Sequence, residues 1–136
     1  MPVEKRYLEL CQELKRQGLR CEFVRGSQIA RGFADLGHEQ FTVIGPQQIL
    51  SNFTGAKSSL AEPEREFFFW VPDADDLVEC IQRADFNVLE LQYQEQRSWV
   101  ARVENIANKE VLEFAAPTLL LCLGKSLCHC LGIRNV

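Results

Sequence analysis

The sequence predicts an α+β fold, a sandwich in which helices flank a mainly antiparallel sheet. Two observations predict it: amphipathic helical patterns near both ends and in the middle of the chain, and strand patterns clustered between them. The chain has 136 residues, of which 46% are hydrophobic and 25% are charged, as is usual for a globular domain. We therefore expect residues 1–136 to form a single α+β domain that needs neither disulfides nor a metal to fold.

Three helices are predicted from apolar residues at helical spacing and from residues that suit helix ends. They cover residues 3–17, 74–84 and 118–131. The first has one apolar face, formed by Tyr7, Leu10, Cys11 and Leu14. Gly18 is placed to end this helix in the left-handed conformation, and Asp73 is placed to cap the second. Pro117 is predicted at the first position of the last helix, which Gly132 ends.

Strands are predicted where aromatic or β-branched residues gather, or where apolar and polar residues alternate. They cover residues 20–25, 40–44, 66–71, 87–93, 98–104 and 110–114. Glycines and prolines interrupt residues 26–64, so few regular elements are expected there. In this region we predict a helical turn over residues 47–52 and a long loop over residues 52–63.

Two of the strand patterns also predict burial. In residues 66–71 both faces are apolar, which is typical of a strand covered on both sides. Residues 87–104 alternate on either side of four polar residues, which indicates a β-hairpin with one buried and one solvated face. The buried face is expected to include Leu89, Leu91 and Tyr93.

Charge and composition exclude several classes of protein. The net charge of −4 argues against a protein that binds nucleic acid mainly through phosphates. The longest apolar run, residues 119–123, is far too short to cross a bilayer, and the N-terminal residues lack the apolar core of a targeting signal. We therefore expect a cytoplasmic protein that does not bind a membrane. In that reducing compartment the 6 cysteines are expected to be small buried hydrophobes.

The last helix contains the residues that most resemble a chemical site, Cys122, Cys128, His129 and Cys130. Thiolates and imidazole are preferred zinc ligands. However, successive helical residues point about 100° apart, so the last three cannot converge on one ion. We therefore expect no metal and no other cofactor. Gly124-Lys125-Ser126 resembles the end of a phosphate-binding loop, but the glycine that this motif requires five residues earlier is missing.

Three further groups are assigned structural roles. The carboxylates of residues 73–76 lack the pattern of a calcium loop and suit the start of a helix instead. His38 beside Glu39 is a possible acid–base pair, but no nucleophile accompanies it, so no catalytic residue is assigned. The aromatic residues 67–70 are predicted to lie in a core strand, with an exposed partner-binding surface as the alternative, rather than on a surface that stacks nucleic-acid bases.

Three arginines are the candidate contacts to nucleic acid. Arg20, Arg25 and Arg31 lie in a glycine-containing stretch that could contact a phosphate backbone, with Lys57 as an additional cation. The alternative interpretation is a solvated loop without a ligand. The nucleic-acid hypothesis requires that these side chains converge on one face.

Two segments resemble a known group of proteins. They are "FFFWVPDADDLVECIQ" and, later, "WVARVE…EFAAPTLLLCLGKSL". Over residues 66–131 they are similar to the phage ABA sandwich proteins, in which a hairpin strand and an acidic-apolar strand precede a helix that begins near Ala-Pro-Thr. This resemblance implies a sheet with helices on both sides. It implies no activity, since the function of these phage and prophage proteins is itself obscure.

The sequence therefore favours one function and leaves two alternatives open. The favoured function is a non-enzymatic accessory or protein-interaction domain, with a protein partner or self-association as a homo-oligomer, and with a phage or mobile-element origin. The first alternative is a nucleic-acid-associated regulatory protein that uses the three arginines. The second is a small enzyme or metal-binding protein that uses His38, Glu39 or the C-terminal cysteines and histidine, and enzymatic activity is the less favoured interpretation.

Overall fold

The computed structural model describes residues 4–20, 23–33, 37–95 and 97–133. It confirms the α+β class, since helices accompany antiparallel sheets. There are two such sheets rather than one, with five and three strands. Contacts divide the chain into two compact units, which we call the N-terminal unit (residues 1–72) and the C-terminal unit (residues 73–136). That residues 1–136 behave as one domain stays a prediction.

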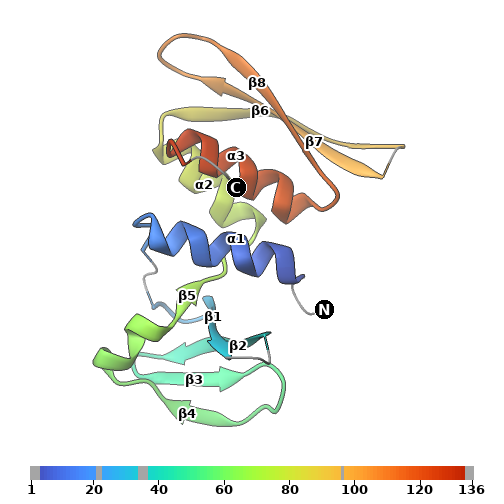
Figure 1. Ribbon diagram of the computed structural model, residues 1–136. Helices are drawn as coiled ribbons and strands as arrows, with labels where there is room; N and C mark the ends of the chain where they lie inside the picture. Colours follow the sequence, from blue (N-terminus) through green and yellow to red (C-terminus); the bar gives the residue numbers. More distant parts are fainter. Residues whose placement is uncertain (1–3, 21–22, 34–36, 96, 134–136) are drawn as a thin grey trace. The chain divides into compact units, whose positions relative to one another are not determined.

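The described residues of the N-terminal unit form one α-helix, five strands and a 3-10 helix (Figure 1). Its elements are α1 (Lys5–Arg16), β1 (Gln28–Phe33), β2 (Gly37–Gly45), β3 (Gln48–Ser51), β4 (Lys57–Ser59), η2 (Glu62–Phe67) and β5 (Phe69–Trp70). The sheet has the order β4-β3-β2-β1-β5, and every neighbouring pair is antiparallel. One face of this sheet carries the buried cluster of Ile29, Phe41, Val43, Ile49, Leu60 and Phe68, against which Phe23 packs.

Helix α1 agrees with its prediction. Its apolar face is buried, and Gly18 follows it with a positive φ of 106°, a conformation that favours glycine because other residues carry a Cβ. The helix is joined to the end of the unit by Tyr7, whose hydroxyl donates a hydrogen bond of 2.6 Å to the carbonyl of Pro72. Because both groups are buried, this bond satisfies a carbonyl that water does not reach.

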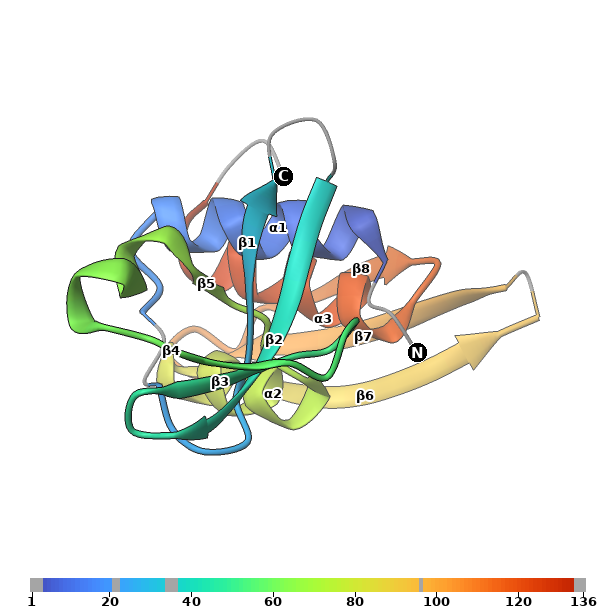
Figure 2. The same ribbon diagram turned by 90° about the horizontal axis from the view of Figure 1, so that it is seen from below.

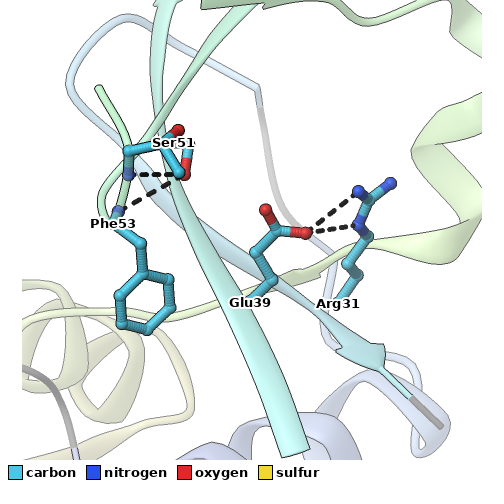
Figure 3. A network of polar contacts seen from close by, with 5 residues as sticks. Arg31, Glu39, Ser51 and Phe53 are labelled. Carbon is cyan, nitrogen blue, oxygen red and sulfur yellow. Dashed lines mark hydrogen bonds and ion pairs between the residues drawn. The ribbon is translucent and has the colours of Figure 1, made fainter. Parts of the chain in front are cut away.

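The prediction for residues 47–52 is wrong, because Gln48–Ser51 form β3 and these described residues contain no helical turn. Ile49 and Ser51 are buried while Gln48 is exposed, which is the period of two of a strand. Buried Ser51 is satisfied by the turn that follows, since its Oγ accepts hydrogen bonds of 3.3 Å from the backbone N–H groups of Phe53 and Thr54 (Figure 3). The predicted loop over residues 52–63 is also interrupted, by the edge strand β4.

Two further strand predictions fail in this unit. Of residues 20–25, the described ones contain no strand, and residues 21–22 lie outside the described chain. Of residues 66–71, only β5 is a strand, since η2 occupies residues up to Phe67. Pro63 explains the difference, because a fixed φ and a missing N–H suit the first turn of a helix.

The C-terminal unit is a three-stranded sheet with two helices (Figure 1). Its elements are α2 (Ala74–Arg83), β6 (Phe86–Gln94), β7 (Ser98–Asn105), β8 (Val111–Ala116) and α3 (Leu119–Cys130). The sheet order is β6-β7-β8, with both pairs antiparallel. The two helices contact each other, α2 contacts β6, and α3 contacts β7 and β8, so both helices cover the same face.

Local signals set the ends of both helices. Asp73 accepts a hydrogen bond of 2.8 Å from the N–H of Asp76, and the Asp76 carboxylate accepts one of 3.1 Å from the N–H of Asp73. This reciprocal capping box confirms the predicted start of α2. The predicted start of α3 needs a correction, because Thr118 is its N-cap and Pro117 therefore precedes the helix. The Thr118 hydroxyl satisfies the Leu121 N–H at 3.3 Å, which Pro117 cannot do.

The predicted hairpin is confirmed, but its predicted burial on β6 is wrong. Leu89, Leu91 and Tyr93 are exposed, by 49%, 37% and 55%. Leu89 lies in a bulge between Val88 and Glu90, which breaks the alternation on which the prediction rested. For Leu91 and Tyr93 the reason is length: nine residues of strand extend about 30 Å, whereas the twelve residues of α3 extend only about 18 Å. Figure 2 shows the β6–β7 hairpin continuing well past the end of α3, so no helix or strand described in the C-terminal unit covers its outer part.

Candidate functional site

The outer part of the β6–β7 hairpin presents apolar side chains. In the register of the hairpin, Leu91 lies opposite Ala101 and Tyr93 lies opposite Trp99, so these four residues share one face. Ala101 is fully buried, whereas Leu91 and Tyr93 are exposed. The rings of Tyr93 and Trp99 pack with their centroids 5.4 Å apart. We call Leu91, Tyr93 and Trp99 the arm surface.

The other face of the hairpin is polar. The Glu90 carboxylate and the Arg102 guanidinium form an exposed ion pair at 3.6 Å. Gln92, Gln94 and Glu113 lie around this pair in a shallow hollow. An exposed ion pair of this kind contributes little free energy, so this face is a solvated surface and contrasts with the arm surface.

Strand β6 is an uncovered sheet edge. Within the described residues it pairs only with β7. A register shift between Val88 and Glu90 marks a bulge, beyond which the ladder is regular to Gln94. That regular stretch contains one charge, on Glu90, and has no Lys, Arg or Pro of the kind that usually protects an edge. Its unpaired N–H and C=O groups are therefore suited to pairing with another strand.

The structure gives one of the three candidate arginines a carboxylate partner. Arg31 donates to Glu39 at 3.0 and 3.2 Å (Figure 3), and its guanidinium lies 5.2 Å from the ring centroid of Phe41. Its charge is thus neutralised by a carboxylate. Arg25 is exposed in the turn before β1, and Arg20 is exposed after α1. Among the described side chains, no contact joins one of these arginines to another, and Lys57 lies on β4.

His38 and Glu39 do not form an acid–base pair. They are adjacent in β2, so their side chains point to opposite faces of the sheet. A ring nitrogen of His38 lies 3.2 Å from Oε1 of Gln12, and the ring meets Phe69 edge-on with a centroid distance of 5.6 Å. Since Glu39 is bound to Arg31, each member of the pair has a structural partner of its own.

The C-terminal cysteines are not activated thiols. Cys122 and Cys128 are buried in α3, whereas His129 is exposed and contacts the rings of Phe86 and Phe114. Burial raises the pKa of Cys130 to about 12, and burial also raises the pKa of Cys122. A raised pKa disfavours the thiolate, which is the form that attacks and binds metals. Within the part of the chain that the structure describes, no group of three His, Cys, Asp or Glu side chains could hold a metal ion.

The remaining candidates are part of the scaffold. Gly124-Lys125-Ser126 lies inside α3, where Ser126 donates a hydrogen bond of 2.9 Å to the carbonyl of Cys122. The aromatic run divides, because Phe68 and Phe69 are buried while Phe67 is 72% exposed. These positions therefore form no phosphate loop and no continuous stacking surface.

The arm surface itself was missed in the sequence, since alternation placed Leu91 and Tyr93 in the core. The signal that could have identified it is the length of the hairpin relative to the helix that follows. No helix of the described chain is long and apolar enough to cross a membrane. Comparison of the sequence and structure with protein-family models, with curated proteins and with solved structures finds no match.

Proposed function

We propose that the chain is a non-enzymatic protein-interaction domain that binds a second copy of itself through the edge of β6. The observation that carries this proposal is the exposure of Leu91 and Tyr93 on an edge strand that no other described segment pairs. Exposed apolar side chains beside unpaired backbone groups are the two components of strand addition. In such pairing the backbone supplies the hydrogen bonds and the side chains supply the specificity.

Charge and the extent of the regular ladder favour one register for the pairing. The regular ladder of β6 runs from Glu90 to Gln94, so its midpoint is Gln92. An antiparallel pair centred there places Leu91 opposite Tyr93 of the second copy, and Glu90 opposite Gln94 of the second copy. A pair centred on Glu90 would instead place two carboxylates opposite each other, which is destabilising. The expected assembly is a continuous six-stranded sheet shared by two chains.

The expected association is modest in strength. The apolar area that it removes from water comes from a few side chains on each copy, and each Å² contributes about 25 cal/mol. An interface of this kind is at or below the lower end of stable interfaces, about 1,200 Å². We therefore expect dimers that form and dissociate with concentration. The phage or mobile-element origin stays a prediction, as does the identity of any partner other than a second copy.

The experiment is light scattering after size-exclusion chromatography, over a wide range of protein concentration. The native chain is expected to approach twice its monomer mass of 15.6 kDa as concentration rises. Leu91→Glu should keep it monomeric. Val111→Glu is the matched control, because Val111 on the β8 edge is 38% exposed and Leu91 is 37% exposed. A native chain that stays monomeric throughout, or a control variant that dissociates the dimer as strongly, would overturn the proposal.

A further inference from the structure

A pocket of 330 Å³ lies within the N-terminal unit, between the end of α1, residues 18–20, Phe23 and the η2–β5 region. Its lining combines cationic and aromatic side chains. The cations are Lys15, Arg20 and Arg65, and the rings include Phe23, Phe68 and Trp70. These residues come from segments about fifty positions apart, and the fold brings them together.

Among the described residues, no carboxylate forms an ion pair with the cations of this pocket, whereas Arg16 pairs with Glu13 at 2.9 Å nearby on α1. Lys15 donates to the backbone carbonyl of Glu66, an uncharged acceptor. The one acidic side chain in the lining, that of Glu66, is exposed. The lining residues that the structure describes therefore carry two positive charges in excess.

Arg65 is held in a fixed orientation with unused donors. Its guanidinium lies 5.0 Å from the ring centroid of Phe23, and one terminal nitrogen donates 2.9 Å to the carbonyl of Pro46. Its Nε is enclosed and has no hydrogen-bond partner in the described chain. A guanidinium has five N–H donors, and those of Arg65 that remain available to an anion are the other N–H groups on its two terminal nitrogens.

From this arrangement we infer that the pocket binds a phosphate group joined to a planar base, as found in a nucleotide. Cations without carboxylate partners bind phosphate oxygens, and aromatic walls stack with a base whatever its identity. A volume of 330 Å³ is at the lower end of ligand pockets, which suits one nucleotide at a time. The ligand has two possible sources with the same chemistry, a free mononucleotide or one residue of a single strand.

This site differs from the surface that the sequence predicted. It retains Arg20 but replaces Arg25 and Arg31 with Lys15 and Arg65. It also lies in the unit with the less acidic balance: residues 1–72 contain nine basic and nine acidic residues, whereas residues 73–136 contain six and ten. The inference does not depend on the pairing of β6, because no residue of the pocket belongs to the C-terminal unit.

The test uses the fluorescence of Trp70, which lines the pocket. Only 2 tryptophans are present, so Trp99→Phe leaves Trp70 as the single reporter. The full chain with this change is titrated with thymidine monophosphate, with a short oligothymidylate and with inorganic phosphate. Saturable quenching by the mononucleotide supports a free nucleotide as the ligand, and quenching by the oligonucleotide alone supports a single strand. No quenching by either, or equal affinity for inorganic phosphate, would overturn the inference.

Substitutions of the pocket cations test whether the nucleotide binds in this pocket. Arg20→Gln should weaken binding about tenfold, because one charge-assisted hydrogen bond is lost. The Arg20 side chain is exposed and forms no hydrogen bond or ion pair with a described residue, so the substitution should leave the fold intact. Lys15→Gln should act in the same direction. Arg25→Gln is the matched control, since it removes the same charge from an exposed residue of the same unit outside the pocket. Equal losses for Arg20→Gln and Arg25→Gln would show non-specific attraction and would overturn the inference.

Discussion

The hydroxyl of Tyr7 donates a hydrogen bond of 2.6 Å to the carbonyl of Pro72, across 65 positions of the chain. Tyr7→Phe removes the donor and leaves a buried carbonyl unsatisfied. We expect a loss of about 1–3 kcal/mol in the free energy of unfolding, measured by urea denaturation. The chain supplies its own control, because Tyr93 is the only other tyrosine and is exposed. If Tyr93→Phe lowers the free energy of unfolding as much as Tyr7→Phe does, the hydrogen bond to Pro72 does not stabilise the fold as proposed.

Asp73 caps α2 and belongs to the capping box with Asp76. Asp73→Ala should lower the free energy of unfolding by about 0.5–2 kcal/mol, because the N–H of Asp76 loses its acceptor. Asp75→Ala removes the same charge from the first turn without removing a cap, and its effect should be smaller. Thermal unfolding followed by circular dichroism measures both variants. A larger loss for Asp75→Ala would contradict the capping role.

The raised pKa of the Cys130 thiol should make the folded chain less stable as the pH becomes alkaline. Burial raises its pKa from 9.0 to about 12 in the folded chain. As pH rises above 9.0, the thiol of the unfolded chain ionises first. Ionisation therefore stabilises the unfolded state relative to the folded state, whose thiol stays protonated. The contribution of Cys130 to stability is therefore complete below pH 9.0 and is lost as pH rises toward the folded value.

The measurement is urea unfolding of the native chain and of Cys130→Ser, below and above pH 9.0. The native chain should lose more stability with rising pH than the variant does. Alkylation by iodoacetamide, mapped to the Cys130 peptide by mass spectrometry, should also be slow at neutral pH and faster after unfolding. A difference between the two chains that stays constant with pH would contradict the raised pKa.

The sequence predicted the elements whose signals are local. Helix α1 follows from apolar spacing and Gly18, and α2 follows from Asp73. The β6–β7 hairpin follows from two alternating stretches close in sequence. Strands β1, β3 and β4 were missed or misassigned, because their stability comes from pairing with residues elsewhere in the chain. Propensity within a window does not contain that information.

The candidate surfaces were harder to predict from the sequence than the helices and strands were. Leu91 and Tyr93 fit a core pattern, and only the relative lengths of β6 and α3 leave them exposed. The pocket in the N-terminal unit depends on Lys15 and Arg65, which are fifty residues apart. Arg31 was a candidate because of its charge, but the partner that neutralises it, Glu39, is set by the register of β1 with β2.

The pairing of two β6 edges is tested most directly by crosslinking at the predicted midpoint. In the proposed register Gln92 lies opposite Gln92 of the second copy, so Gln92→Cys should give a dimer with a short bis-maleimide. Arg102→Cys is the control, because Arg102 lies on the same polar face but on the central strand β7. We expect crosslinked dimer for Gln92→Cys and only the level of the native chain for Arg102→Cys. Gln92→Cys crosslinking no better than the native chain would contradict the proposed assembly.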